Sequence, residues 1–188
     1  MCIRDRALRP HRKRVQIVFQ DPYRSLNPRR SVGSSIVEGP VNYGMAEDTA
    51  QQRARELMRL VGLEPDALAR FPHQFSGGQR QRICIARALA MDPEILVADE
   101  PVSALDVSVQ AQVLRLLDDV RQRFNLAVLF ITHDLRVAAQ VCDRIAVMHK
   151  GEVVEEGRTT DVFGAPKHAY TRALFESAPG RNFAFGRF

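Results

Sequence analysis

The stretch FSGGQRQR at residues 75–82 decides the fold class, together with ILVADEP at residues 95–101 and ITHD at residues 131–134. A serine followed by two glycines is typical of a helix start whose first backbone N–H groups remain open to an anion. The apolar run at residues 95–98 predicts a buried parallel strand. We therefore expect an α/β domain built around a parallel sheet.

Patterns of strand and helix alternate along most of the chain on both sides of this stretch. Period-two and continuous apolar runs predict strands at residues 15–20, 95–98, 126–132, 144–149 and 152–156. Apolar residues at spacings of three and four predict helices at residues 48–63, 78–91, 107–124 and 135–142. This alternation is typical of a layered α/β domain.

Composition excludes several classes of protein. The chain has 188 residues, of which 45% are hydrophobic and 26% charged, as in a globular domain. Its longest apolar run, residues 127–131, is far shorter than the roughly 20 residues of a membrane span, so we expect neither a membrane-spanning nor a secreted protein. The three cysteines form no C-x-x-C pair, and a reducing compartment fits best.

The net charge of +5 is concentrated in basic clusters at residues 4–14 and 24–30. We expect these clusters to be a solvated face. Contact with nucleic acid or anionic lipid is the alternative.

Two adjacent carboxylates, Asp99 and Glu100, follow the apolar run at residues 95–98 and should lie at the carboxyl end of a strand, where open α/β sheets bind ligands. Because adjacent residues point to different sides, one carboxylate can hold Mg²⁺ while the other polarises an attacking water. A strand ending in Asp-Glu also occurs as a plain loop cap. The pair therefore gains weight only from its neighbours.

Ser76, Gly77, Gly78 and Gln79 form a second candidate site. The glycines let the backbone approach an anion closely, and the helix start directs N–H groups and a positive dipole end toward it. An ordinary helix start is the simpler interpretation of this segment taken alone.

His133 and Gln20 each follow a predicted strand. The imidazole of His133 can reach a γ-phosphate and its attacking water from such a position, and the Gln20 amide can ligate Mg²⁺ or orient water. Each residue alone is more often structural.

These motifs, in this order, resemble the nucleotide-binding subunit of ATP-binding cassette (ABC) transporters, over about residues 15–179. The resemblance implies the following roles: Q-loop glutamine for Gln20, signature motif for residues 75–79, Walker B aspartate for Asp99, catalytic glutamate for Glu100, D-loop for residues 103–106 and switch histidine for His133.

Three further segments resemble the ATPases of dipeptide and oligopeptide importers. They are FQDPYRSLNPRRSVG at residues 19–33, DEPVSALDVSVQAQ at residues 99–112 and KHAYTRAL at residues 167–174. Ala169 stands where that subfamily usually has proline. Related ATPases serve importers of nickel, glutathione and other small solutes, so the resemblance leaves the solute open.

The resemblance also implies cofactors and partners. ATP and Mg²⁺ would lie between two ABC ATPase subunits, with Ser76, Gly77, Gly78, Gln79 and Asp106 as nucleotide-binding residues, the signature residues acting on the partner's ATP. Two transmembrane permease subunits and a periplasmic or extracellular solute-binding protein would complete the importer, and nucleic acid would not be a partner. The subunit would lie peripherally on the cytoplasmic face of the bacterial inner membrane.

One motif of the family is missing from the sequence. No G-x-x-x-x-G-K-[ST] phosphate loop precedes residue 75, and residues 1–14 contain no glycine to cradle a phosphate. We therefore expect an incomplete P-loop NTPase-like ABC ATPase domain at residues 15–164, with a helical signature subdomain at about residues 26–92. A non-native or disordered start at residues 1–14 and an importer-type extension at residues 165–188 would flank it.

This interpretation predicts a chain that neither hydrolyses ATP nor folds well alone. Two other roles stay open. The chain could be a non-catalytic partner that supplies the signature motif in trans, or a soluble ABC ATPase of nucleic-acid metabolism.

Overall fold

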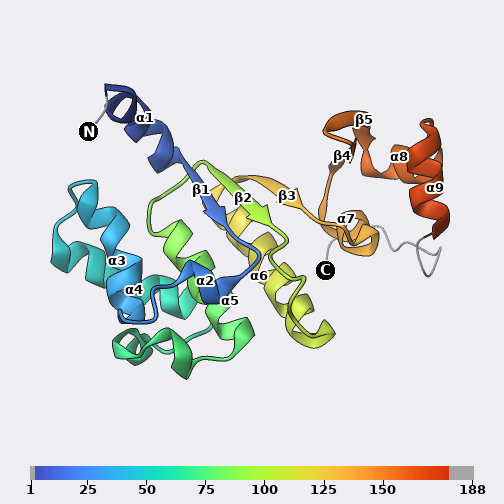
Figure 1. Cartoon of the computed structure of the whole chain (residues 1–188). Coiled ribbons are helices and arrows are strands. Elements are labelled where there is room, and N and C mark those ends of the chain that lie inside the picture. Colours follow the sequence, from blue (N-terminus) through green and yellow to red (C-terminus); the bar gives the residue numbers. More distant parts are fainter. Residues whose placement is uncertain (1–2, 178–188) are drawn as a thin grey trace. The chain divides into compact units, whose positions relative to one another are not determined.

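The computed structural model describes residues 3–177 of the chain. The chain divides into two compact units, Met1–Ile131 and Thr132–Phe188 (Figure 1). The sequence predicts a family domain that begins after residue 14 and ends at residue 164. The division at residue 131 rests on contacts within the chain and does not test those limits, which stay predictions. Within residues 3–177, no helix is both long enough and apolar enough to cross a bilayer.

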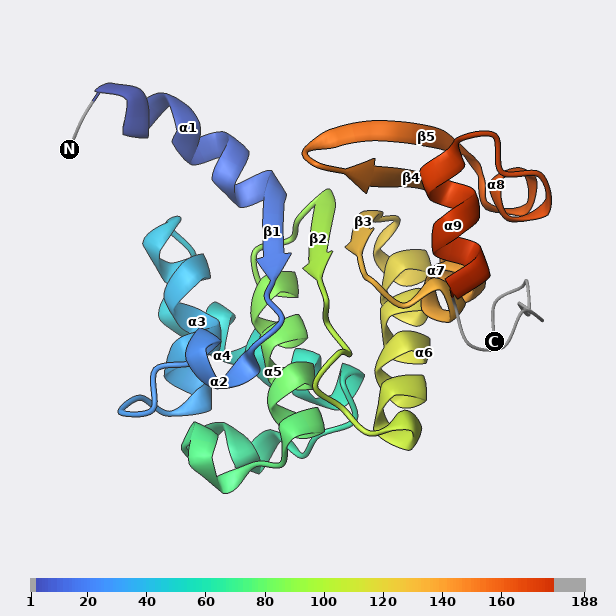
Figure 2. The same ribbon diagram turned by 45° about the vertical axis from the view of Figure 1, so that its right-hand side comes forward.

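A three-stranded parallel sheet forms the centre of the first unit. Its strands lie side by side in the order β1 (Val15–Val18), β2 (Ile95–Asp99) and β3 (Ala127–Ile131) (Figure 2). The three strands expected from the sequence are confirmed, with ends within two residues of those predicted. Because all three strands run the same way, their carboxyl ends meet at one edge.

The two faces of this sheet differ in burial. Val18, Leu96 and Ala98 on one face are fully buried, as apolar strand residues packed on a helix should be. On the opposite face Ile17 is 42% exposed and Leu129 58% exposed, and both are aligned with Val97 in the register. One side of the sheet therefore carries the core of the unit and the other presents apolar side chains.

Helices pack on the buried side and around it. They are α2 (Pro22–Ser25), α3 (Val32–Asn42), α4 (Glu47–Leu60), α5 (Gly77–Leu89) and α6 (Val107–Phe124), with short 3-10 turns η1 (Pro65–Ala69) and η2 (Pro72–Gln74). The helices expected near α4, α5 and α6 are confirmed. α2 and α3 have no individual counterpart among the predicted helices, although α3 lies inside the helical subdomain expected at about residues 26–92.

The first described residues form a helix, α1 (Ile3–Arg14), where the sequence predicts an unstructured start. Contacts with distant segments hold it. Arg14 donates to Glu94 through Nε and Nη2 at 2.7 and 2.6 Å, and the Tyr43 hydroxyl donates to the Arg9 carbonyl at 3.0 Å. These tertiary contacts stabilise a helix that the sequence, which has no apolar periodicity here, does not predict.

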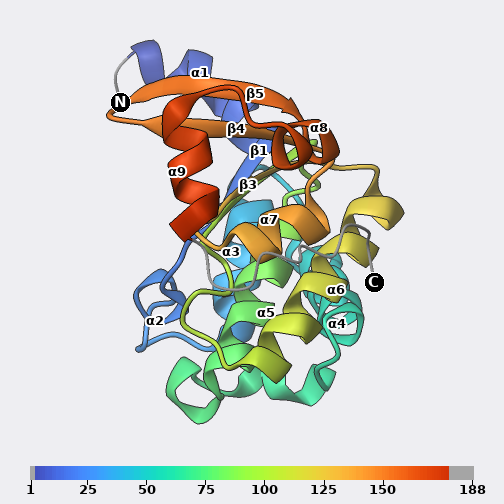
Figure 3. The same ribbon diagram turned by 90° about the vertical axis from the view of Figure 1, so that its right-hand side faces the viewer.

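As far as residue 177, the second unit is an antiparallel hairpin with three helices. Its elements are α7 (Leu135–Val141), β4 (Arg144–His149), β5 (Glu152–Arg158), α8 (Thr159–Gly164) and α9 (Ala169–Ser177) (Figure 3). Val147, Val162 and Phe175 form its small core. The expected helical extension is confirmed at α9, and the remainder of that prediction, residues 178–188, lies outside the described residues.

Candidate functional site

Gln20 and Glu100 meet at the carboxyl edge of the parallel sheet. Each lies just beyond one of two neighbouring strands, β1 and β2. The Gln20 side-chain Nε2 donates to Glu100 Oε2 at 2.8 Å and lies 3.3 Å from the Ser103 hydroxyl. Ser103 in turn donates to the Glu100 carbonyl at 3.1 Å. Three polar side chains therefore converge where a phosphate ligand of an α/β sheet would bind.

The backbone of Glu100 has an uncommon conformation. Its φ of +44° lies in the left-handed region, which few non-glycine residues adopt. The Glu100 N–H donates to the Ile131 carbonyl at 2.9 Å, which fixes this turn to the end of β3. Strained backbone of this kind concentrates at functional sites, so the conformation supports a role for Glu100 beyond ending a strand.

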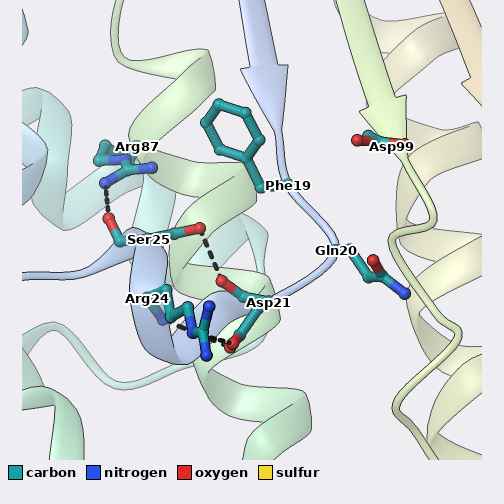
Figure 4. A pocket seen from close by; sticks show the side chains of 7 residues that line it. All are labelled: Phe19, Gln20, Asp21, Arg24, Ser25, Arg87 and Asp99. Atoms are coloured by element: carbon teal, nitrogen blue, oxygen red, sulfur yellow. Dashed lines mark hydrogen bonds and ion pairs between the residues drawn. The ribbon is translucent and has the colours of Figure 1, made fainter.

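A pocket of about 530 Å³ opens beside the Gln20 segment. Figure 4 shows Gln20 and Asp99 on one side of Phe19, and on the other side the hydrogen-bonded group around Ser25. The lining residues are Phe19, Gln20, Asp21, Arg24, Ser25, Arg87 and Asp99.

The Asp99 carboxylate and the Gln20 amide supply oxygen ligands of the kind that Mg²⁺ takes. Nowhere in residues 3–177 do three or more His, Cys, Asp or Glu side chains gather as a metal cage. This donor set fits an ion that takes its remaining ligands from phosphate and water, as Mg²⁺ does in nucleotide sites.

The segment at residues 76–79 begins helix α5 through a capping box. The Ser76 hydroxyl accepts from the Gln79 N–H at 3.3 Å, and the Gln79 Oε1 accepts from the Ser76 N–H at 2.9 Å. Both side chains are exposed. Of the two residues between them, Gly77 is exposed and Gly78 is buried. Binding of an anion at this helix start stays a prediction.

Gly77 and Gly78 have different reasons to be glycine. A Cβ at Gly77 would meet only Leu105 Cδ2 at 3.7 Å, an ordinary contact, so this exposed position leaves room for a ligand. A Cβ at Gly78 would lie 2.3 Å from Val109 Cγ1 on α6. Gly78 therefore serves the close packing of α5 on α6, and the approach of an anion does not account for it.

Asp106 is engaged as the N-cap of α6. Its Oδ1 accepts from the Val109 N–H at 3.0 Å and from the Ser108 hydroxyl at 2.8 Å. The Val109 N–H, followed by the Ser108 hydroxyl, lowers the pKa of this carboxyl below its ordinary value. The expected nucleotide-binding role of Asp106 stays a prediction beside this structural one.

His133 belongs to the second unit, where it is exposed and precedes α7. The next residue, Asp134, caps that helix: its Oδ1 accepts from the Arg136 N–H at 2.8 Å, and its own N–H donates to Thr132 Oγ1 at 3.0 Å. His133 is therefore held in a tight turn before a helix. Its role as a switch histidine stays a prediction.

Sequence reasoning missed the residues that fix α2 to α5. The Arg80 guanidinium carbon lies 3.6 Å from the centre of the Tyr23 ring, and Arg87 donates to the Ser25 carbonyl. The signal available in the sequence was the seven-residue spacing of Arg80 and Arg87, which places the two arginines on the same face of a helix. Ser103 was considered only as part of a motif, and its bond to Gln20 was not foreseen.

Comparison with known proteins gives a consistent result. The family model described as ABC transporter matches residues 2–103. A glutathione import ATP-binding protein from Pectobacterium atrosepticum is 49% identical over 174 residues, which are 92% of this chain and 28% of that protein. A protein from Brucella ovis that is named as a peptide import ATP-binding protein is 49% identical over 175 residues, which are 93% of this chain and 55% of that protein.

Among solved structures, cbiO1 from Clostridium perfringens, part of the ABC transporter complex cbiONQ, superposes with a TM-score of 0.76 at 30% identity. The match covers 85% of this chain and 63% of that chain. The chain thus spans between about a quarter and about half of the curated relatives it matches.

Proposed function

The chain belongs to the ABC transporter family, and we propose that it is part of the ATP-binding and ATP-hydrolysing subunit of an importer for di- or oligopeptides, inactive without the phosphate loop of that subunit. The observation that supports this most is the hydrogen bond between Gln20 and Glu100 at the carboxyl edge of the sheet. This bond holds Gln20 and Glu100 next to each other, as their proposed roles in ATP hydrolysis require. Names of the relatives support import of peptides or glutathione as the solute class.

In this proposal each residue at the sheet edge has one task. Glu100 accepts a proton from the attacking water, and Gln20 orients that water or ligates the metal. Asp99 holds Mg²⁺, directly or through water. Bound MgATP supplies the scissile phosphoanhydride. His133, assigned from its motif, adds a group that can hold the γ-phosphate and the water.

The α5 start would act across a dimer. Ser76, Gly77 and Gln79 present polar groups at an exposed helix N-terminus, which suits the γ-phosphate of ATP bound to a second ABC ATPase subunit. Gly78 and Asp106 would support this surface from behind, through the packing and capping described above. Two permease subunits and a solute-binding protein would complete an importer at the cytoplasmic face of the inner membrane.

A chimera tests the catalytic assignment. We would join residues 15–188 to the segment of the Brucella ovis relative that precedes its counterpart of residue 15. The measurement is Mg²⁺-dependent phosphate release from ATP. We expect turnover, and a loss of about 100-fold or more on Glu100→Gln, because the proton acceptor is removed. Glu64→Gln, at an exposed site outside the sheet edge, is the matched control. Equal rates for Glu100→Gln and the parent chimera would contradict the assignment.

A second role, without catalysis, is supported by the exposed cap at Ser76 and the open space at Gly77. Here the chain would supply only its α5 start to the ATP of a complete subunit. The 188-residue chain should then restore ATPase activity to a full-length relative whose own signature serine is disabled. Ser76→Asp should abolish the rescue, because a carboxylate repels the γ-phosphate. No rescue by the wild-type chain would exclude this role.

A further inference from the structure

Arg80 lies between the α5 cap and the Gln20 segment. It is only 7% exposed, although arginine is rarely buried without a partner. Its Nε lies 3.4 Å from the Ser76 carbonyl, and its guanidinium carbon lies 3.6 Å from the centre of the Tyr23 ring. Among residues 3–177, its buried Nη1 meets no hydrogen-bond acceptor. The face of the Tyr23 ring therefore stabilises the charge that an acceptor would otherwise stabilise.

Tyr23 belongs to α2, a single helical turn directly after Gln20. Asp21 caps this turn, and its Oδ1 accepts from the Tyr23 N–H at 2.8 Å. Arg87, seven residues after Arg80 on α5, donates to the Ser25 carbonyl at the other end of the turn. Two arginines on one face of α5 therefore contact α2, Arg80 through the Tyr23 ring and Arg87 through the Ser25 carbonyl. These contacts link α2, which follows Gln20 closely in the chain, to the helix that Ser76 caps.

We propose that Arg80 is a positioning residue that couples the Ser76 cap of α5 to Gln20 through the Tyr23 ring. A displacement of Ser76 would move the Arg80 side chain that its carbonyl holds, then the ring stacked on it, then the turn that carries Gln20. Gln20 reaches Glu100 at 2.8 Å, so the same displacement alters the side chain at the sheet edge. The consequence for hydrolysis rests on the proposed function, whereas the coupling itself does not.

The first test uses the 188-residue chain without nucleotide, so that it can fail while the proposed ATPase function stands. Amide hydrogen exchange of residues 21–26 is compared in the wild type and in Arg80→Met, Tyr23→Leu and Tyr23→Phe. We expect exchange about tenfold faster in Arg80→Met and in Tyr23→Leu, because each removes the cation–π contact. Tyr23→Phe retains the ring and should behave as the wild type.

Arg82→Met is the matched control. Arg82 is on the same helix, but it donates to the Val61 carbonyl and to Gln112 Oε1, away from α2. It should leave exchange at residues 21–26 unchanged. The Arg80→Met/Tyr23→Leu double variant should be no faster than either single variant, since one contact is removed by both. Additive effects, or an unchanged Tyr23→Leu, would overturn the proposal.

A spectroscopic readout separates positioning from general destabilisation. The side-chain amide resonance of Gln20, assigned by its loss in Gln20→Leu, should shift in Arg80→Met and in Tyr23→Leu and stay in place in Tyr23→Phe and Arg82→Met. Arg80→Lys keeps the charge but not the planar group and should shift it partway. A Gln20 resonance that ignores every Arg80 and Tyr23 variant would refute the coupling.

Discussion

Gly78 is restricted to glycine by the neighbouring helix. Because a Cβ there would lie 2.3 Å from Val109 Cγ1, Gly78→Ala should force α5 and α6 apart. We expect a loss of about 1–3 kcal/mol in the free energy of unfolding, as for other overpacked cores. Urea denaturation followed by circular dichroism measures it.

Two variants make this prediction specific. Gly77→Ala introduces the same methyl group where the nearest atom is 3.7 Å away, and it should change stability by less than about 0.5 kcal/mol. Val109→Ala in the Gly78→Ala background removes the clashing atom and should restore part of the loss. A Gly78→Ala chain as stable as the wild type would show that α6 yields without cost.

The same pair of glycines shows how far single residues could be predicted. Their position at a helix start followed from the sequence, and the capping box of Ser76 and Gln79 agrees with it. The reason for Gly78 did not follow, because Val109 is 31 positions away on another helix and no local pattern reveals their contact. Gln20 and Glu100 were both placed at strand ends, but their hydrogen bond depends on β1 and β2 being neighbours.

The carboxylate of Glu155 helps to attach helix α9 to its hairpin. Glu155 on β5 accepts from the Lys167 N–H at 2.8 Å and from the His168 N–H at 3.0 Å, just before the helix begins. These backbone donors, Lys167 first, lower the pKa of Glu155 from 4.5 to about 2. Tyr170 on the same helix stacks on His149 of β4 with ring centres 3.9 Å apart.

This attachment predicts a pH dependence. A carboxyl whose pKa is lower in the folded chain stabilises it above the unfolded value of 4.5, and this contribution is lost as the pH falls toward about 2. Glu155→Gln should therefore lower the melting temperature at neutral pH, and the gap to wild type should close between about pH 4.5 and pH 2. Thermal melts across this range measure it.

Glu156→Gln, the next residue along β5 and exposed, is the control for a simple loss of charge. It should show no such convergence with the wild type. A gap between Glu155→Gln and wild type that stayed constant down to pH 2 would contradict the assignment of the attachment to the ionised carboxylate.

Elements with an uninterrupted period were predicted to the residue. Helix α6 and strand β4 have the expected bounds, 107–124 and 144–149, because one apolar face runs through each. The bounds of helix α3 were missed because Gly33, Gly39 and Pro40, which disfavour helix, interrupt its apolar periodicity. Ser31 nevertheless caps this helix, and its apolar residues are spaced along one face. α1 was missed for the opposite reason, since distant residues hold it and its own sequence does not.

Taken by itself, over residues 3–131, the first unit leaves one face of its sheet uncovered. Several apolar side chains on this face are exposed by more than a third: Val15, Ile17, Phe19, Ile95, Leu129 and Ile131. The described strands also leave the outer edges of β1 and β3 unpaired. Apolar faces and open edges of this kind promote association, so we expect the isolated chain to self-associate. Poor folding of the isolated chain stays a prediction.

Leu129→Lys tests this feature. It places a charge in the middle of the exposed face, where Leu129 is 58% exposed, and should reduce both binding of an apolar dye and self-association. The free energy of unfolding should change by less than about 0.5 kcal/mol, as at other surface sites. Dye fluorescence and sedimentation velocity measure the two effects.

Leu96→Lys is the counterpart on the buried face, where it should unfold the chain because the charge has no partner there. If instead the wild type is monomeric, binds no dye and melts in one sharp transition, the exposed face is harmless and the expectation of poor folding is wrong.

The bond between Gln20 and Glu100 also bears on the order in which the chain folds. The two residues are 80 positions apart, and the helices α3, α4 and α5 lie between them. Closing so long a loop costs entropy that local contacts do not return, whereas helices form within microseconds. We expect these helices to form first and β1 to join β2 late, so that Gln20 reaches Glu100 only when folding of the unit is complete.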